Sequence, residues 1–163
     1  LRPHRYVAFV DRSGGSSDSM TLAVAHREGD DAVLDAVREA KPPFSPEAVV
    51  GEFAMVVRSY GARQVTGDKY GGEFPRELFR RRGLAYEVCD QTRSDLYLSL
   101  VPAVNSGRVR LLELVLDVVG GVDPELGERL EHLRMGVRPW RAACRSRLVA
   151  PVGLAAQQAL AHQ

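Results

Sequence analysis

Cysteine is scarce in this chain, and long apolar runs are missing. Cys89 and Cys144 are the only cysteines among the 163 residues. They are isolated and show no CxxC spacing, so the sequence indicates neither a zinc site nor a disulfide framework. No run approaches the ~18 apolar residues that a membrane span requires, and no signal peptide is recognisable. These absences predict a protein of a reduced, cytoplasmic compartment.

An excess of charge of one sign is also lacking. Lys and Arg number 22 and Asp and Glu number 21, which gives a formal net charge of +1. No strong overall field therefore draws the chain to nucleic acid or to a membrane surface, and any DNA binding has to come from a local patch. The hydrophobic content of 45% is enough for one compact core.

Several catalytic motifs are absent as well. The run Gly14-Gly15-Ser16-Ser17 lacks the spaced Gly-Lys-Ser/Thr of a phosphate-binding loop. The histidines show no paired metal spacing and no Ser-His-Asp context, and we expect His26 to lie on a strand face. We expect Cys89, at a strand end, to be a small core residue. The sequence thus excludes an ATPase of the P-loop class and gives no support to nucleophilic catalysis.

Two aspartates stand out, each at the end of an apolar run. Asp11 ends the run 6–10 and opens into a loop of Ser and Gly, and Asp68 ends the run 64–67 and opens into Tyr70-Gly71-Gly72. A carboxylate at the edge of a buried strand costs stability unless it is paired, and a hard cation such as Mg²⁺ offsets that cost. The alternative for each is a turn residue or a helix N-cap.

The order of predicted elements favours the metal interpretation. We predict antiparallel strands over 6–11, 20–26 and 32–38, then a helix that Ser45 caps, that begins at Pro46 and that Gly61 ends. Such an order requires a mixed sheet covered by helices, and it places the first and fourth strands side by side, with Asp11 and Asp68 at one edge. The later elements are a strand over 63–68, a helix over 74–82, a strand over 84–88, a helix over 94–104 with an apolar face of Leu96, Leu98, Leu100 and Val101, and a strand over 108–112.

This arrangement resembles the ribonuclease-H-like nuclease fold, and four stretches resemble the C-terminal nuclease domain of phage terminase large subunits, the motors that package viral DNA. The similarity covers residues 5 to about 112, and four motifs in order are more specific than any one of them. The stretches are FVDRSGGSSDSMTLA over 9–23, TGDKYGGEFP over 66–75, SDLYL over 94–98 and NSGRV over 105–109.

The resemblance implies a metal-dependent endonuclease that cuts double-stranded DNA during genome packaging. Asp11 and Asp68 match two of the three acidic ligands with which that family holds two Mg²⁺ or Mn²⁺ ions. Asp18 also lies in a matching stretch, and we favour a turn hydrogen bond for it over contact with a metal ligand. The implied partners are double-stranded DNA, an ATPase domain upstream of Leu1, a portal and a small terminase subunit.

The family's third acid has no counterpart here. No Asp or Glu follows Glu131, whereas five arginines do. Asp90 and Asp95 are candidate replacements, although we expect Asp95 to face solvent.

We interpret 1–112 as the nuclease core and 113–163 as a divergent segment with one short helix and a tail, for which a frameshift and a genuine divergent helix remain alternatives. The alternative function is a catalytically weak, DNA-binding remnant of a prophage terminase; a junction resolvase or transposase core fits the motifs less well.

Basic residues near Asp68 form a candidate DNA-binding patch. Lys and Arg groups of this kind contact phosphates, and the alternative is a solvated helix end that favours the helix dipole. The residues of this patch are Lys69, Tyr70, Arg76, Arg80 and Arg81, with Arg82 beside them, and Glu73 is expected to cap the helix that follows.

Overall fold

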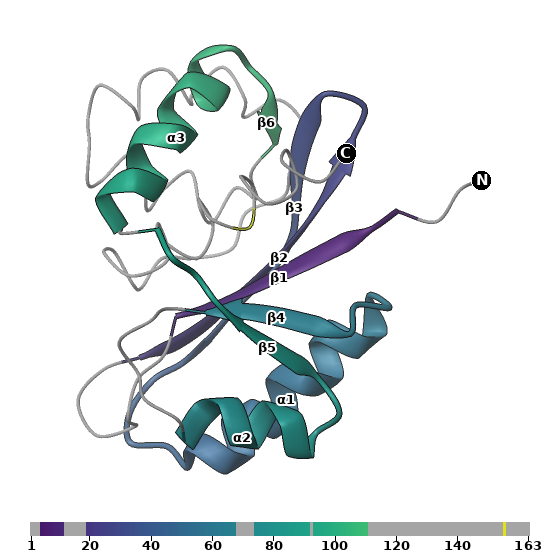
Figure 1. The fold of residues 1–163 in the computed structure, drawn as a ribbon, viewed down its shortest axis with the longest axis vertical. Helices are drawn as coiled ribbons and strands as arrows, with labels where there is room; N and C mark the ends of the chain where they lie inside the picture. The colour runs from purple at the N-terminus through teal and green to yellow at the C-terminus, as the bar shows by residue number, and fades with distance from the viewer. Residues whose placement is uncertain (1–3, 12–18, 68–73, 92, 111–154, 156–163) are drawn as a thin grey trace.

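The computed structural model describes residues 4–11, 19–67, 74–91, 93–110 and 155 (Figure 1). No helix within these ranges is both long and apolar enough to cross a membrane. The elements follow the predicted order: β1 (Tyr6–Asp11), β2 (Met20–Glu28), β3 (Asp31–Ala40), α1 (Pro46–Ser59), β4 (Gln64–Gly67), α2 (Phe74–Arg81), β5 (Ala85–Val88), α3 (Arg93–Asn105) and β6 (Val109–Arg110).

The strands form one mixed sheet in the order β5-β4-β1-β2-β3-β6. β1 pairs antiparallel with β2 and parallel with β4, and β4 pairs parallel with β5. The predicted neighbourhood of the first and fourth strands is therefore confirmed. Since β1, β4 and β5 run in the same direction, their carboxyl ends meet at one edge of the sheet.

The hairpin of β2 and β3 has a shorter turn than the sequence analysis predicted. β2 and β3 stay paired as far as Glu28 opposite Asp31, so Gly29 and Asp30 alone form the turn. Gly29 has φ +61°, which suits a two-residue hairpin loop. Both strands extend beyond their predicted ends, and Glu39 therefore belongs to β3.

Helix α1 covers one face of the sheet. Ser45 occupies the predicted N-cap position, but its side chain makes no capping hydrogen bond; its carbonyl accepts one from the amide of Val49 at 3.1 Å. Gly61 has φ +73° and follows the last turn as predicted. The inward side of α1 is Val49, Val50, Gly51, Phe53, Ala54 and Val57.

The two faces of the sheet differ in what they bury. Ala8 and Val10 of β1 join the apolar core beneath α1 and α2. Successive side chains of a strand point to opposite faces, so Phe9 and Asp11 face the other side. Figure 1 shows α1 and α2 on one side of the sheet and α3 on the other.

Helix α3 departs from the predicted apolar face. Leu98 is 73% exposed, whereas Leu100, Ala103 and Val104 are buried. The predicted face was wrong at Leu98 because positions two apart do not share one side of a helix, whereas positions three or four apart do.

Candidate active site

Asp11 stands at the carboxyl edge of the sheet. It is the last residue of β1, it is half-buried, and it pairs with Thr21 of β2. On the other side of β1, Val10 pairs with Gly67, the last residue of β4. Asp68 follows Gly67 in the sequence but lies outside the described residues. The ends of the two strands that carry the predicted carboxylates are thus hydrogen-bonded neighbours.

Gly67 is required here because an aromatic side chain crosses it. A Cβ atom at this position would lie 1.9 Å from the Tyr86 hydroxyl oxygen and 2.6 Å from its Cζ. Tyr86 comes from β5, and its ring lies 5.7 Å from that of Phe79, centroid to centroid. A side chain larger than hydrogen at position 67 would therefore overlap the Tyr86 phenol.

Two polar side chains that the sequence analysis missed lie in line with Asp11 across the sheet. Thr21 pairs with Asp11 on one side and with Glu39 of β3 on the other. Thr21 is 1% exposed, and within the described ranges neither its Oγ1 nor the buried Oε1 of Glu39 has a hydrogen-bond partner. The available signal was the spacing of Asp35, Val37 and Glu39, because residues two apart point to the same face of a strand. The predicted strand, however, ended at Arg38.

The proposed replacements for the third acid are both exposed. Asp90 follows β5 at the same edge of the sheet, and Asp95 lies in the first turn of α3, as expected for a solvent-facing residue. Within the described ranges, no group of three or more His, Cys, Asp and Glu side chains is arranged to hold a metal. Asp18, Asp68 and Glu73 lie outside those ranges.

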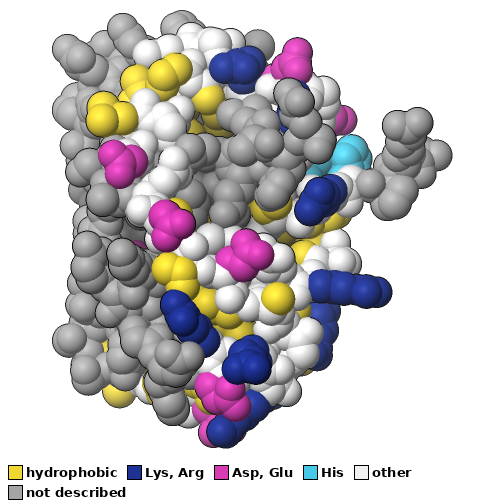
Figure 2. Space-filling model, in the orientation of Figure 1, with side chains coloured by type: hydrophobic (Ala, Val, Ile, Leu, Met, Phe, Trp, Pro, Cys, Tyr) yellow, Lys and Arg dark blue, Asp and Glu magenta, His cyan; other side chains and the backbone are white. Residues whose placement is uncertain are grey.

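Much of the predicted basic patch is already paired. Glu77 lies 3.2 Å from Arg81 Nε and 3.7 Å from Arg80 Nη1, with both arginine side chains largely exposed. Arg82 lies against Gly51 of α1, where a Cβ atom would be 3.0 Å from its Nη1. Lys69 and Tyr70 are outside the described residues, and Arg76 is half-buried at the start of α2. Figure 2 shows Lys and Arg side chains gathered on the lower part of one face, with Asp and Glu among them.

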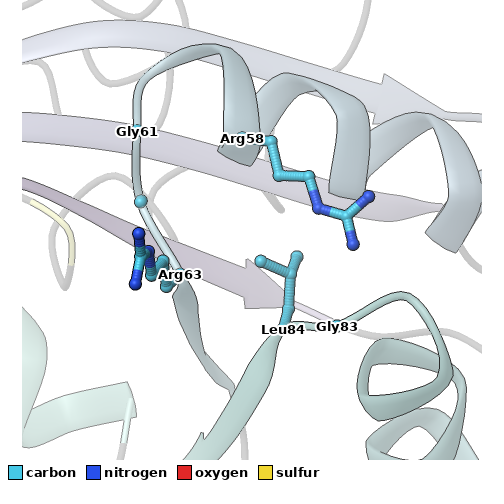
Figure 3. Close-up of a pocket in the computed structure, with 6 residues that line it drawn as sticks. Arg58, Gly61, Arg63, Gly83 and Leu84 are labelled. Atoms are coloured by element: carbon cyan, nitrogen blue, oxygen red, sulfur yellow. The ribbon is translucent and has the colours of Figure 1, made fainter.

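A surface hollow lies at the other edge of the sheet. It is lined by Arg58 and Gly61 at the end of α1, by Arg63 before β4 and by Gly83 and Leu84 before β5, and the Arg58 side chain extends toward Gly83 and Leu84 (Figure 3). These residues precede the amino ends of β4 and β5, so the hollow is remote from Asp11. It holds no carboxylate and is not the predicted site.

The structure also tests the expectations for His26 and Cys89. His26 is a buried strand residue, as expected, and its Nδ1 lies 2.7 Å from Oδ2 of Asp35. It pairs with Tyr6 at the far end of β1, where burial of the phenol, together with the charge of Asp35, raises the pKa of Tyr6. Cys89 is half-buried instead of buried in the core, because β5 is an edge strand whose residues alternate between exposed and half-buried.

Comparison with protein-family models and with curated protein sequences finds no match. Solved structures do match. The large terminase nuclease of thermophilic phage G20c with bound magnesium has a TM-score of 0.66 at 18% identity, over 97% of this chain and 83% of that chain. In another structure of that nuclease the match has a TM-score of 0.54 at 18% identity and covers 65% of this chain and 57% of that chain.

Two further matches come from other sources. The human cytomegalovirus terminase nuclease domain has a TM-score of 0.52 at 10% identity, over 92% of this chain and 81% of that chain. The RuvC structure of Thermus thermophilus has a TM-score of 0.50 at 14% identity, over 96% and 94%. The predicted fold is confirmed: the chain has the ribonuclease-H-like fold, and its structure is similar to those of large terminase nuclease domains.

Proposed function

We propose that this chain is a metal-dependent endonuclease domain that cuts double-stranded DNA during viral genome packaging. The observation that carries the proposal is the pairing of Val10 with Gly67, because each of these residues is followed in the sequence by a predicted ligand. The similarity of the structure to terminase nuclease domains supports the same choice of reaction.

Asp11 and Asp68 are the proposed catalytic residues and metal ligands. Two carboxylates at adjacent strand ends provide oxygen donors for Mg²⁺ or Mn²⁺, and the similar G20c nuclease has structures with bound magnesium and with bound zinc. When bound, a pair of such ions activates a water and stabilises the departing oxygen of a phosphodiester. The unpartnered oxygens of Thr21 and Glu39 show that this edge of the sheet has acceptor capacity that the described residues leave unused.

The role of the basic residues is to bind and orient DNA. Lys69, Tyr70, Arg76, Arg80 and Arg81 follow Asp68 closely in sequence, and contacts of Lys and Arg with phosphates position a duplex without reading its bases. The net charge of +1 makes such local contacts the main source of DNA affinity. An upstream ATPase domain, a portal and a small terminase subunit are the proposed partners in packaging.

A catalytically weak DNA-binding remnant is the second candidate function. The exposure of Asp90 and Asp95 favours it, because neither has the buried position expected of a replacement for the third acid. The two candidates differ in whether the chain cuts DNA and agree in whether it binds DNA.

A plasmid-nicking assay of the purified chain tests the proposal. We expect nicking with Mn²⁺ or Mg²⁺, none with EDTA, and none for Asp11→Asn or Asp68→Asn, since each substitution removes a charged oxygen ligand. Asp30→Asn is the matched control, because Asp30 is exposed in the β2–β3 turn and should cut normally. Circular dichroism checks that the variants are folded; a folded wild-type chain that never nicks DNA would leave the remnant function, and nicking by both variants would reject the site.

A further inference from the structure

A row of three polar residues crosses the sheet at the candidate site. Asp11 of β1 pairs with Thr21 of β2, and Thr21 pairs with Glu39 of β3. Residues directly opposite one another on neighbouring strands point to the same face. The row therefore extends the Asp11 site two strands away from β4, on the face opposite α1.

Two members of this row, Thr21 and Glu39, have polar atoms that the described residues do not satisfy. Thr21 is 1% exposed, and neither its Oγ1 nor the buried Oε1 of Glu39 has a hydrogen-bond partner within the described ranges. Leaving a buried polar group unpaired costs about 1–3 kcal/mol, and more for a charged one. Nearby cations do not offset this cost: Arg38 donates to the carbonyl of Val37, and Lys41 is exposed.

The chemistry of the row selects a hard cation. An ionised carboxylate offers only acceptors, and a hydroxyl accepts as well as donates, so acceptors outnumber donors in the row and favour a cation over an anion. Strands lie about 4.8 Å apart, which separates the backbones of Asp11 and Glu39 by roughly 10 Å. Mg²⁺ and Mn²⁺ sites keep several bound waters, and such waters extend the reach of the two side chains across Thr21.

We propose that Glu39 is a carboxylate of the divalent-cation site, acting with Asp11 across the hydroxyl of Thr21. The assignment rests on the proposed function in one respect, the role of Asp11 as a metal ligand. It adds to the site a carboxylate from the β2–β3 hairpin, where the resemblance placed one in a C-terminal helix. The proposal gives a reason why Oε1 of Glu39 is buried without a partner among the described residues.

The test is Mn²⁺ binding, measured by calorimetry and by thermal unfolding with EDTA or Mn²⁺. We expect Glu39→Gln to weaken Mn²⁺ binding about 10- to 100-fold, the range found when residues that support metal ligands are replaced. In EDTA the same variant should unfold at a higher temperature than wild type, because it removes the charge of a carboxylate whose Oε1 is buried and unpaired among the described residues. With Mn²⁺ its rise in unfolding temperature should be smaller, because ligand stabilisation follows affinity.

Two variants complete the experiment. Glu52→Gln is the matched control, since Glu52 is exposed on α1 and should bind Mn²⁺ like wild type. Thr21→Val keeps the shape of Thr21 and removes its hydroxyl, so it should also weaken binding if Glu39→Gln does not fold. The proposal is overturned if Glu39→Gln binds Mn²⁺ as tightly as wild type. If Glu39→Gln does not fold, wild-type Mn²⁺ affinity in Thr21→Val overturns it instead. The absence of Mn²⁺ binding in the wild-type chain also overturns it. A wild-type chain that binds Mn²⁺ through Glu39 but leaves DNA intact would overturn the nuclease function alone.

Discussion

Single residues at the carboxyl edge of the sheet determine whether the proposed site can form. Gly67 is the clearest case, because it lets the Tyr86 ring lie across the end of β4. Thr21 and Glu39 have the opposite effect on stability, because they bury polar oxygens that lack a partner among the described residues. The site therefore has a closely packed aromatic ring on the β4 side and buried, unpaired oxygens on the β2 and β3 side.

Gly67→Ala should destabilise the chain by about 1–3 kcal/mol, the usual cost of forcing an extra methyl into a packed position. The new methyl overlaps the Tyr86 phenol, so either the ring or the end of β4 has to move. Urea unfolding monitored by circular dichroism measures the loss. Adding Tyr86→Val should recover part of it, and equal stabilities of the single and double variants would contradict the proposed contact.

Among the elements, β6 has the shortest backbone pairing. It has only two residues, Val109 and Arg110, which pair with Ala32 and Val33 of β3. The Arg110 guanidinium hydrogen-bonds Glu28 at the end of β2 and lies 3.7 Å from Asp31. These side chains connect β6 to the β2–β3 hairpin on the solvent side.

Acid should release β6 before the rest of the sheet. The hydrogen bond from Arg110, and then its charge, lower the pKa of Glu28 below 4.5. A carboxyl whose folded-state pKa is lowered contributes stability above its unfolded pKa, and that contribution is lost as pH falls through the folded value. Hydrogen exchange at the Ala32 amide, which donates to Arg108, should therefore accelerate, after correction for the intrinsic rate, as pH falls below about 4.5.

Arg110→Gln is the comparison for this effect. It removes the charged donor, so exchange at Ala32 should be faster at neutral pH and should change less on acidification. An Arg110→Gln chain with the acid response of wild type would show that Glu28 does not hold β6 in place.

Much of the element order was predictable because the local signals agreed with the fold. Buried strands read as apolar runs, and Ser45, Pro46 and Gly61 marked α1 at both ends. The neighbourhood of β1 and β4 followed from the order of elements. Glu39 was missed because a charged residue shortly before Lys41 and Pro42 suggests a turn. Only its pairing with Thr21 shows that it belongs to the strand. The exposure of Leu98 was missed because the predicted face combined residues two apart, which do not lie on one side of a helix.

At the scale of the whole molecule, charge is balanced, and the proposed DNA affinity should depend on which arginines are already paired. Glu77 contacts Arg80 and Arg81 on α2. Glu77→Gln should strengthen binding to duplex DNA several-fold and steepen its dependence on salt, because two phosphate-binding groups lose an internal competitor. Fluorescence anisotropy with a labelled duplex at several salt concentrations measures both quantities.

Glu87→Gln is the matched control for charge. Glu87 is exposed on β5, and its substitution raises the net charge from +1 to +2, as Glu77→Gln does. Equal gains for the two variants would mean that overall charge, not the arginines of α2, governs binding.

The sheet order also determines when the strands that carry the two proposed catalytic carboxylates can pair during synthesis. β1, β2 and β3 pair with their neighbours in sequence, but β1 meets β4 only after α1 has been made and has crossed the sheet. Domains form as the chain emerges at about 5–20 residues per second, so Asp11 waits several seconds for the strand that precedes Asp68. A nascent or truncated chain that ends before β4 therefore contains Asp11 but lacks Asp68, the other proposed catalytic carboxylate.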